Sequence, residues 1–396
     1  MMQISPETQL FIREHSSDDV RVLALQAKKY PDIDMPTVIT QIAGRKVAAE
    51  KIPSWWEIEK IWYPKHLSLE QCSSEITARY KARLLQGDSL TDLTGGFGID
   101  CSFLATGFKS TTYVERQEEL CEIAAHNFPV LNLNHINIKN EDGVTYLQAM
   151  SPVDCLFLDP ARRNEHGGKT VAISDCEPNV AELEELLLQK ANRVMIKLSP
   201  MLDLSLALKE LKQTQEVHIL SVNNECKELL ILLGQTSPAE ISIHCVNLFT
   251  KGTQKEQHFV FTREQEQCSE CTYTDSLETY LYEPNASLLK AGAFRSIAAA
   301  YPVRKLHPNS HLYTSDTFIE NFPGRIFRIV NQCSFNKKEV KENLADLKKA
   351  NVTVRNFPAT VAELRKRIHL AEGGDTYLFA STLNNGQKVL IRCEKV

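Results

Sequence analysis

The stretch Ser89-Leu90-Thr91-Asp92-Leu93-Thr94-Gly95-Gly96-Phe97-Gly98-Ile99-Asp100 decides how the chain is expected to fold. It begins as a short apolar run, and three glycines then fall within four positions. The following residues, 101–106, are compatible with a helix. A strand, a glycine turn and a helix in this order let a cofactor approach backbone N–H groups closely, because glycine has no Cβ to block it. Such a turn can also do no more than connect a strand to a helix.

Strands and helices alternate from this stretch to about residue 236. The candidate strands are residues 90–93, 111–115, 136–139, 155–159, 193–197, 216–222 and 228–233, and the candidate helices are 101–106, 117–128, 145–150, 180–190 and 204–211. This alternation predicts right-handed βαβ units and a doubly wound, Rossmann-like, mostly parallel sheet of the α/β class. The last two strands are joined by residues 223–227 and can add an antiparallel member.

The flanking regions differ in pattern and predict four domains. Residues 1–65 are expected to be helical, with one helix over 35–51, and an aromatic group at 55–63 can either stack bases or pack against the next domain. Residues 66–236 form the α/β domain. Residues 237–324 are expected to form a small α+β linking domain with a helix over 282–301. Residues 325–396 have the pattern of a small β-α-β-α-β-β domain.

Composition is typical of a globular protein, with 43% hydrophobic and 24% charged residues. No apolar run approaches the roughly 18 residues that a membrane span needs, and the N-terminus has no signal segment. Eleven scattered cysteines, an odd number, indicate reduced thiols. We therefore expect a cytoplasmic protein that does not contact a membrane. Cys268 and Cys271 have no second ligand pair nearby, so no metal is expected.

Charge is distributed unevenly along the chain. Residues 325–396 contain 14 Lys/Arg and 7 Asp/Glu, a net charge of +7. Since the whole chain carries −5, the remaining residues carry −12. A basic C-terminal segment on an acidic body is compatible with a local contact to nucleic acid, and equally with the solvated face of an ordinary helix.

Two cofactors use an acid at the end of the second strand of such a fold. Glu115 follows Gly96 by 19 residues, where it can accept the ribose hydroxyls of NAD or of S-adenosylmethionine. The dinucleotide fingerprint needs a third small residue where Cys101 stands, so S-adenosylmethionine fits better. Ser73 and Ser74 begin a helix just before the turn, which is either ordinarily capped or presents free N–H groups to a carboxylate.

Four motifs in order, Asp92-Leu-Thr-x-Gly-x-Gly98, Glu115, Asp142 and Asp159-Pro-Ala-Arg162, resemble the class I S-adenosylmethionine-dependent methyltransferases. The resemblance covers roughly residues 70–235. The sequence Gln-Cys-Ser-Ser-Glu-Ile-Thr-Ala-Arg-Tyr-Lys-Ala at 71–82, together with the C-terminal domain, is similar to a narrower bacterial group with a THUMP-like C-terminal domain. Because THUMP-type modules accompany RNA-modifying enzymes, the resemblance implies an RNA substrate, a base of tRNA or rRNA.

The resemblance also implies roles for individual residues. The methionine end of the cofactor would be held by Asp92, Thr94, Gly95, Gly96 and Gly98, the ribose by Glu115 and the adenine by Asp142, with Ser73 and Ser74 nearby. Asp159 and Pro160 would accept hydrogen bonds from the substrate, chiefly to position it. Arg162 and Arg163 can clamp a substrate phosphate or pair with surface acids. Lys197 can bind the substrate or form a salt bridge at a strand end.

The substrate motif departs from that of amino-methyltransferases, because Ala161 replaces a second proline and Arg162 an aromatic ring. The arginine is shared with uridine-C5 RNA methyltransferases, but residues 196–201 contain no cysteine nucleophile, which argues against covalent C5 chemistry. Two other functions stay open. Ala161 favours a cofactor-binding, RNA-binding protein without turnover, and the acidic body favours a methyltransferase of a protein or small molecule.

Overall fold

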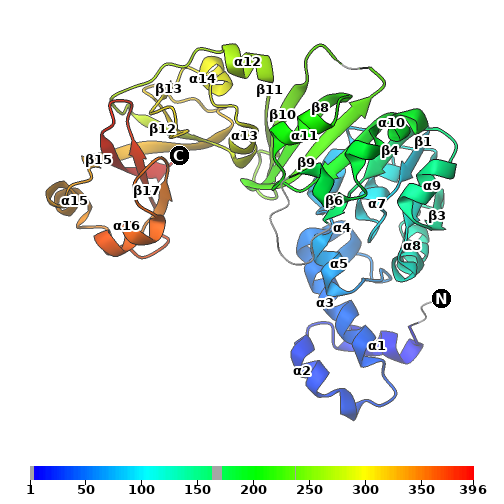
Figure 1. Cartoon of the computed structure of the whole chain (residues 1–396). Helices are drawn as coiled ribbons and strands as arrows, with labels where there is room; N and C mark the ends of the chain where they lie inside the picture. Colours follow the sequence, from blue (N-terminus) through cyan, green and yellow to red (C-terminus); the bar gives the residue numbers. More distant parts are fainter. Residues whose placement is uncertain (1–3, 163–171, 237) are drawn as a thin grey trace. The chain divides into compact units, whose positions relative to one another are not determined.

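The computed structural model describes residues 4–162, 172–236 and 238–396, which form two compact units (Figure 1). Unit 1 comprises Met1–Gln215 with Leu229–Pro238, and unit 2 comprises Glu216–Glu228 with Ala239–Val396. Among the described residues, no helix is both long and apolar enough to cross a membrane. The four domain boundaries expected from the sequence stay a prediction.

Unit 1 begins with short helices, as predicted, drawn in blue in Figure 1. They are α1 (Pro6–Glu14), α2 (Val20–Leu25), α3 (Met35–Lys51), α4 (Pro53–Trp56), α5 (His66–Gln71) and α6 (Glu75–Ala82). The side chain of Asp19 caps α2 by accepting from the Arg21 N–H, and Asp34 caps α3 through Thr37. Helix α3 occupies the residues expected from its apolar spacing.

The aromatic group after α3 packs inside unit 1. Trp55 and Tyr63 are both only 2% exposed, and they share one apolar cluster with Phe97 of the glycine turn. The rings of Trp55 and Phe97 meet edge to face, with centroids 5.2 Å apart. Trp55 and Tyr63 therefore serve packing, whereas Trp56 of the same group is 42% exposed.

The sheet of unit 1 has the predicted doubly wound α/β order. Its strands are β1 (Ser89–Asp92), β2 (Ser110–Glu115), β3 (Ile136–Asn140), β4 (Val153–Leu158), β7 (Ala191–Leu198) and the second half of β9 (Glu225–Gly234). They lie in the order β9-β7-β4-β1-β2-β3. All pairs are parallel except β7 with β9, which is the expected antiparallel member. A short ribbon of β5 (Ala161–Arg162) and β6 (Cys176–Glu177) lies apart from it.

The order of these strands places a topological switch point between β1 and β4. Helices α7 (Ile99–Ala105), α8 (Glu118–Val130), α9 (Gly143–Ala149), α10 (Val180–Lys190) and α11 (Leu204–Glu210) connect the strands. From β1 the chain winds one way to β2 and β3, and later the other way from β4 to β7. Right-handed crossovers then put the two sets of helices on opposite faces, and the carboxyl ends of β1 and β4 diverge. Ligands of open α/β sheets bind at such a switch point.

Unit 2 contains two groups of strands. The first group is β8 (Thr214–Val222), β10 (Ser242–Leu248) and β11 (Glu256–Thr262), in the order β11-β10-β8, followed by α12 (Arg263–Cys268). Asn223 and Asn224, at φ of 50° and 68°, make the turn after β8. The second group is a seven-stranded sheet in the order β13-β14-β12-β15-β18-β17-β16.

The end of the chain follows the predicted β-α-β-α-β-β pattern. It is built from β15 (Gly324–Ser334), α15 (Lys337–Leu344), β16 (Asn351–Val354), α16 (Val361–Ile368), β17 (Thr376–Thr382) and β18 (Lys388–Lys395). Thr360 and Glu363 cap α16 reciprocally, and Gly386 at φ of 86° allows the turn between β17 and β18.

The prediction of one helix over residues 282–301 is wrong. The segment starts with strand β12 (Tyr280–Pro284), which pairs with β14 (Tyr313–Ser315) and with β15. Two short helices follow, α13 (Ala286–Ala291) and α14 (Ser296–Ala300), and Gly292 at φ of 77° separates them. Strand β13 (Arg304–Lys305) completes this edge of the sheet. Cross-strand pairing holds residues 280–284 in a strand, whereas the small residues after Asn285 do form helix, interrupted at Gly292.

Candidate active site

The glycine turn directly follows β1, which ends at Asp92. Gly96 and Gly98 have φ of +55° and +85°, in the left-handed region that favours glycine. Gly95 is needed for another reason, since a Cβ there would lie 2.2 Å from the ring of Tyr113. A Cβ on Gly96 would meet only the Thr94 carbonyl oxygen, at an ordinary contact distance of 3.8 Å. Gly96 is therefore required by its backbone conformation rather than by close packing.

Glu115, the acid at the end of β2, lies against this turn. One carboxylate oxygen accepts from the Gly96 N–H at 2.8 Å, and the other accepts from the Gln117 N–H at 2.8 Å. The residue is only 8% exposed. Each oxygen can accept a second hydrogen bond. Glu115 thus fixes the shape of the turn and keeps acceptor capacity for hydroxyl groups.

Asp92 contributes a buried oxygen that lacks a hydrogen bond. Its Oδ1 accepts from the Thr94 N–H at 3.0 Å, whereas its Oδ2 has no hydrogen-bond partner in the described part of the chain. Burial raises the pKa of Asp92 well above its ordinary value, and the charges of Asp100, Asp159 and Glu115 raise it further. An unsatisfied buried carboxylate oxygen is costly, so this position suits a cationic donor.

A network of buried charges lies beside Asp92 and connects four segments. Ser73 donates to Asp100 Oδ2 at 2.7 Å and accepts from Lys81 at 2.9 Å and Lys197 at 3.1 Å. A serine hydroxyl has one donor and two acceptor sites, so Ser73 is fully used. Lys81 also pairs with Asp100 Oδ1 at 3.0 Å, and Lys197 reaches Asp159 Oδ2 at 2.5 Å. The predicted residues Ser73, Lys197 and Asp159 are therefore brought together.

The two lysines keep Asp100 ionised inside the protein. Burial alone would raise the pKa of Asp100, but Lys81, Lys197 and the Ser73 hydroxyl outweigh burial and hold it at about 2. A carboxylate with this pKa is charged throughout the physiological range. Asp100 is therefore the fixed negative centre around which both ammonium groups are placed.

Asp159 is the member of the network that faces outward. Its side chain is 38% exposed, compared with 10% for Lys197 and 0% for Lys81. Its backbone N–H donates to Thr94 Oγ1 at 2.6 Å, which ties the end of β4 to the end of β1. Asp159 thus presents a partly exposed carboxylate at the end of β4, and Lys197 contacts it from the buried side.

Asp142 caps α9 close to the same edge of the sheet. Its Oδ1 accepts from the N–H groups of Val144 and Thr145, both at 3.0 Å. A Cβ on the next residue, Gly143, would lie 2.2 Å from the Leu93 carbonyl oxygen, so the start of α9 touches the segment after β1. The exposed Asp142 carboxylate follows β3, with one oxygen engaged in capping α9 and the other available.

The remaining predicted residues have varied positions. Ser74 is at the N-cap of α6, as the sequence predicts, and its hydroxyl lies 3.2 Å from Thr77 Oγ1 without a side-chain capping bond to the backbone. Pro160 is buried directly after Asp159. Arg162 belongs to β5, and its side chain and the whole of Arg163 lie outside the described residues.

Two central residues, Lys81 and Asp100, were not among the sequence candidates. Lys81 closes the 71–82 motif, and Asp100 comes two residues after the last glycine of the turn. A signal was present, because both lie on helices whose neighbouring positions, Ala78, Cys101 and Leu104, are fully or almost fully buried. A charged residue on such a face needs a partner inside the fold.

The chain is similar to known families and structures over its whole length. A family of THUMP-like domains matches residues 324–395, and a family of ferredoxin-like domains matches residues 280–323. The crystal structure of a candidate methyltransferase from Porphyromonas gingivalis W83 is 34% identical, with a TM-score of 0.88, and the match covers 100% of both chains. A search of curated proteins finds no match.

Other solved structures match only part of the chain. A candidate methyltransferase from Streptococcus mutans, in complex with SAH, is 13% identical, covering 40% of this chain and 96% of that one with a TM-score of 0.30. An rRNA methylase from Streptococcus thermophilus is 14% identical, covering 40% and 93%, with a TM-score of 0.29.

Proposed function

The chain belongs to the class I S-adenosylmethionine-dependent methyltransferases, in the bacterial group with a THUMP-like C-terminal domain, and we propose that it methylates RNA, at a base of tRNA or rRNA. S-adenosylmethionine supplies an activated methyl group on its sulfonium. The residues of the chain then have to bind the cofactor, orient the accepting atom and exclude water.

The main support for cofactor binding, on which the proposed function depends, is the buried oxygen of Asp92 that lacks a hydrogen bond. Its Oδ2 is buried without a hydrogen-bond partner among the described residues, at the end of the strand that leads into the glycine turn. The amino group of the cofactor is a cation that would satisfy this oxygen. Thr94 and the backbone of Gly95, Gly96 and Gly98 would hold the methionine end next to it.

Two further acids fit the rest of the cofactor. Glu115 retains acceptor capacity on both carboxylate oxygens and would bind the ribose hydroxyls. Asp142 would take the adenine amino group with the oxygen that capping leaves available. Ser73 would act indirectly through Asp100, and Ser74 through the N-terminus of α6.

Asp159, Pro160 and Lys197 would act on the substrate. Lys197, 2.5 Å from Asp159 Oδ2, pairs with the carboxylate and fixes its direction. The other oxygen and the Pro160 carbonyl are acceptors for an N–H group of the base, which aims the accepting atom at the methyl group. Such a site works by positioning, so small displacements of Asp159 should cost rate. Arg162 and Arg163 would hold a substrate phosphate.

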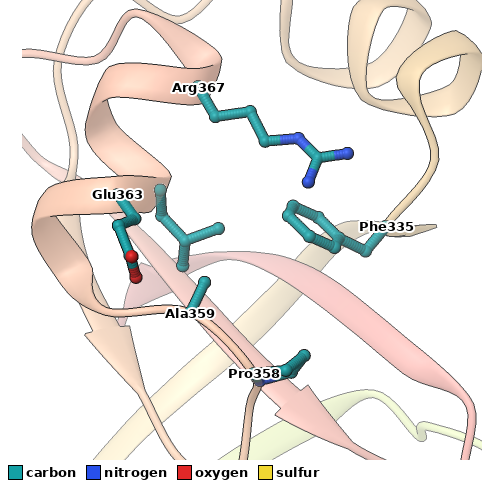
Figure 2. Close-up of a pocket in the computed structure, with 6 residues that line it drawn as sticks. Phe335, Pro358, Ala359, Glu363 and Arg367 are labelled. Carbon is teal, nitrogen blue, oxygen red and sulfur yellow. The ribbon is translucent and has the colours of Figure 1, made fainter.

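The C-terminal domain supports an RNA substrate by its charge and by one small pocket. A hollow of about 250 Å³ is lined by Phe335, Pro358, Ala359, Glu363, Leu364 and Arg367. Figure 2 shows the side chains that surround it. The Arg367 guanidinium lies 4.1 Å from the centre of the Phe335 ring. Aromatic rings and guanidinium planes are the surfaces on which unpaired bases stack. Residues 325–396 carry a net +7, which favours the phosphate backbone.

A second candidate function follows from Ala161. This exposed residue replaces the second proline of the substrate motif, so the chain could bind cofactor and RNA without turnover. The two functions predict the same cofactor binding and differ only in methyl transfer. A protein or small-molecule substrate would instead leave RNA unlabelled and unbound.

Isothermal titration with S-adenosylmethionine, S-adenosylhomocysteine and NAD tests the cofactor site. We expect micromolar binding of the two sulfur compounds, none of NAD, and a loss of about tenfold or more in Glu115→Ala. RNA binding is tested separately with Phe335→Ala and Arg367→Ala, which should weaken it while cofactor affinity stays unchanged. No binding of either sulfur compound by the folded protein would refute the proposal.

A further inference from the structure

Three neighbouring strands of unit 2 bring histidines together on one face. In the register of these strands Glu216 faces Ser242 and His218 faces His244, while His258 faces Val246, two residues along from His244. Because side chains alternate along a strand, Glu216, His218, His244 and His258 project from the same face of β8, β10 and β11. Local motif searches miss such a group, since each strand contributes only one or two members.

The polar atoms of this group point toward one another. His218 Nε2 lies 3.2 Å from Glu216 Oε2, and ligand atoms of Glu216, His218 and His244 all lie within 4.8 Å of one another. His244 Nε2 lies 3.1 Å from Ser242 Oγ, the residue that faces Glu216 in the register. Both Nε2 atoms are thus directed to the end of the cluster where the carboxylate lies.

The other nitrogen of His244 has an outer partner. His244 Nδ1 lies 3.1 Å from His258 Nε2, so it can donate its proton there and leave Nε2 free of hydrogen. Metal-bound imidazoles usually donate the second ring N–H in this way, which fixes the tautomer and the ring direction. The rings of His218 and His244 are stacked, with centroids 4.3 Å apart, which holds the two side by side.

We propose that Glu216, His218 and His244 bind one divalent transition-metal ion of the Zn²⁺ type, with His258 as an outer positioning residue. Two imidazoles and one carboxylate are a common ligand set for Zn²⁺, and solvent takes the fourth position. Tetrahedral coordination needs ligand atoms about 3.3 Å apart, so no pair of these atoms, all within 4.8 Å of one another, has to close by more than about 1.5 Å.

This proposal differs from the sequence analysis, which expected no metal because it considered only the pair Cys268 and Cys271. His218 is only 2% exposed, so one ligand is already held inside the fold. The site uses none of the residues proposed for methyl transfer.

The test is Zn²⁺ binding by the full-length protein after chelator treatment and removal of the chelator. We expect one Zn²⁺ per chain by titration calorimetry, with a matching metal content by mass spectrometry, and a rise in melting temperature on adding Zn²⁺. Glu216→Gln and His244→Asn should each weaken binding more than tenfold, and His258→Ala by about 10–100-fold. Cys268→Ser, the matched control, should bind like the wild type.

Glu216→Gln keeps the shape of the side chain, so this variant still tests the role of the carboxylate in Zn²⁺ binding if His244→Asn fails to fold. Absence of Zn²⁺ binding at micromolar concentrations would overturn the proposal. Binding that survives Glu216→Gln but is lost in Cys268→Ser would overturn it equally, because the metal would then be held by thiols. Cofactor titration of the same samples distinguishes this failure from a failure of the proposed methyltransferase site.

Discussion

Lys197 at the end of β7 lies with its Nζ 2.5 Å from Oδ2 of Asp159, the residue that follows β4. This contact joins the partly exposed carboxylate at the end of β4 to the buried network around Asp100. The position of the proposed substrate-binding carboxylate therefore depends on charges inside the fold, and several consequences can be measured.

Replacing Lys197 by methionine should impair methyl transfer more than cofactor binding. The methionine keeps the aliphatic length but leaves Asp159 without the ammonium group that directs it. We expect kcat to fall about 100-fold, the usual effect of misplacing a positioning group by about 1 Å, with the S-adenosylmethionine KM changed only a few-fold. The control is Lys109→Met, which removes an exposed pair with Asp88 and should leave both constants unchanged. A rise in the S-adenosylmethionine KM with kcat unchanged would contradict this role.

Replacing Asp92 by asparagine should separate stability from cofactor binding. Asparagine removes the carboxylate charge that burial disfavours, so the free protein should gain about 1 kcal/mol or more at pH 7. The cofactor's amino group would lose a charged acceptor, which should weaken S-adenosylmethionine binding about 10–100-fold. Urea unfolding and calorimetric titration measure the two effects. A variant that is less stable yet binds normally would show that Asp92 is purely structural.

Lys81 should be among the most sensitive positions for folding. It is fully buried and pairs with Asp100 at 3.0 Å, so Lys81→Met leaves the Asp100 charge only partly compensated. We expect a loss of about 3–5 kcal/mol in the free energy of unfolding, measured by urea denaturation. The double variant Lys81→Met with Asp100→Asn should recover a part of that loss. Additive losses in the double variant would mean that the two residues are not coupled.

Acid should destabilise the protein partly through Asp100. Its folded-state pKa of about 2 lies below the ordinary 3.8, so its stabilising contribution is complete above about pH 4 and is lost as the pH falls through about 2. The shift corresponds to about 2 kcal/mol. Asp100→Asn should lower stability at pH 7 but reduce its dependence on pH below 4. Urea unfolding at pH 7, 4 and 2.5 measures this, and parallel curves for the two proteins would contradict it.

The regular elements could be predicted because their signals are local. Helix α10 has the predicted bounds Val180–Lys190, since apolar spacing defines its buried face and Asn179 caps its start. The glycine turn and Glu115 were recognisable for the same reason, because their roles depend on backbone conformation and on position after a strand.

The missed features depend on residues far apart in the sequence. Strand β12 is defined by pairing with β14 and β15, whereas its own residues fit a helix equally well. Lys197 contacts Asp100, which lies 97 positions away in the sequence. The residues around Lys81 likewise do not indicate which acidic residue pairs with it. The strand register that groups Glu216, His218 and His244 has no local signature either.

The most direct test of the central claim is transfer of a tritiated methyl group from S-adenosylmethionine to RNA. Total RNA from cells lacking this gene would be incubated with wild type and with Lys197→Met. We expect label in the RNA fraction that ribonuclease releases and protease does not, and about 100-fold slower labelling with the variant. Cofactor binding without label in RNA would contradict RNA methylation, and label in protein or in small molecules instead would redirect it to another substrate.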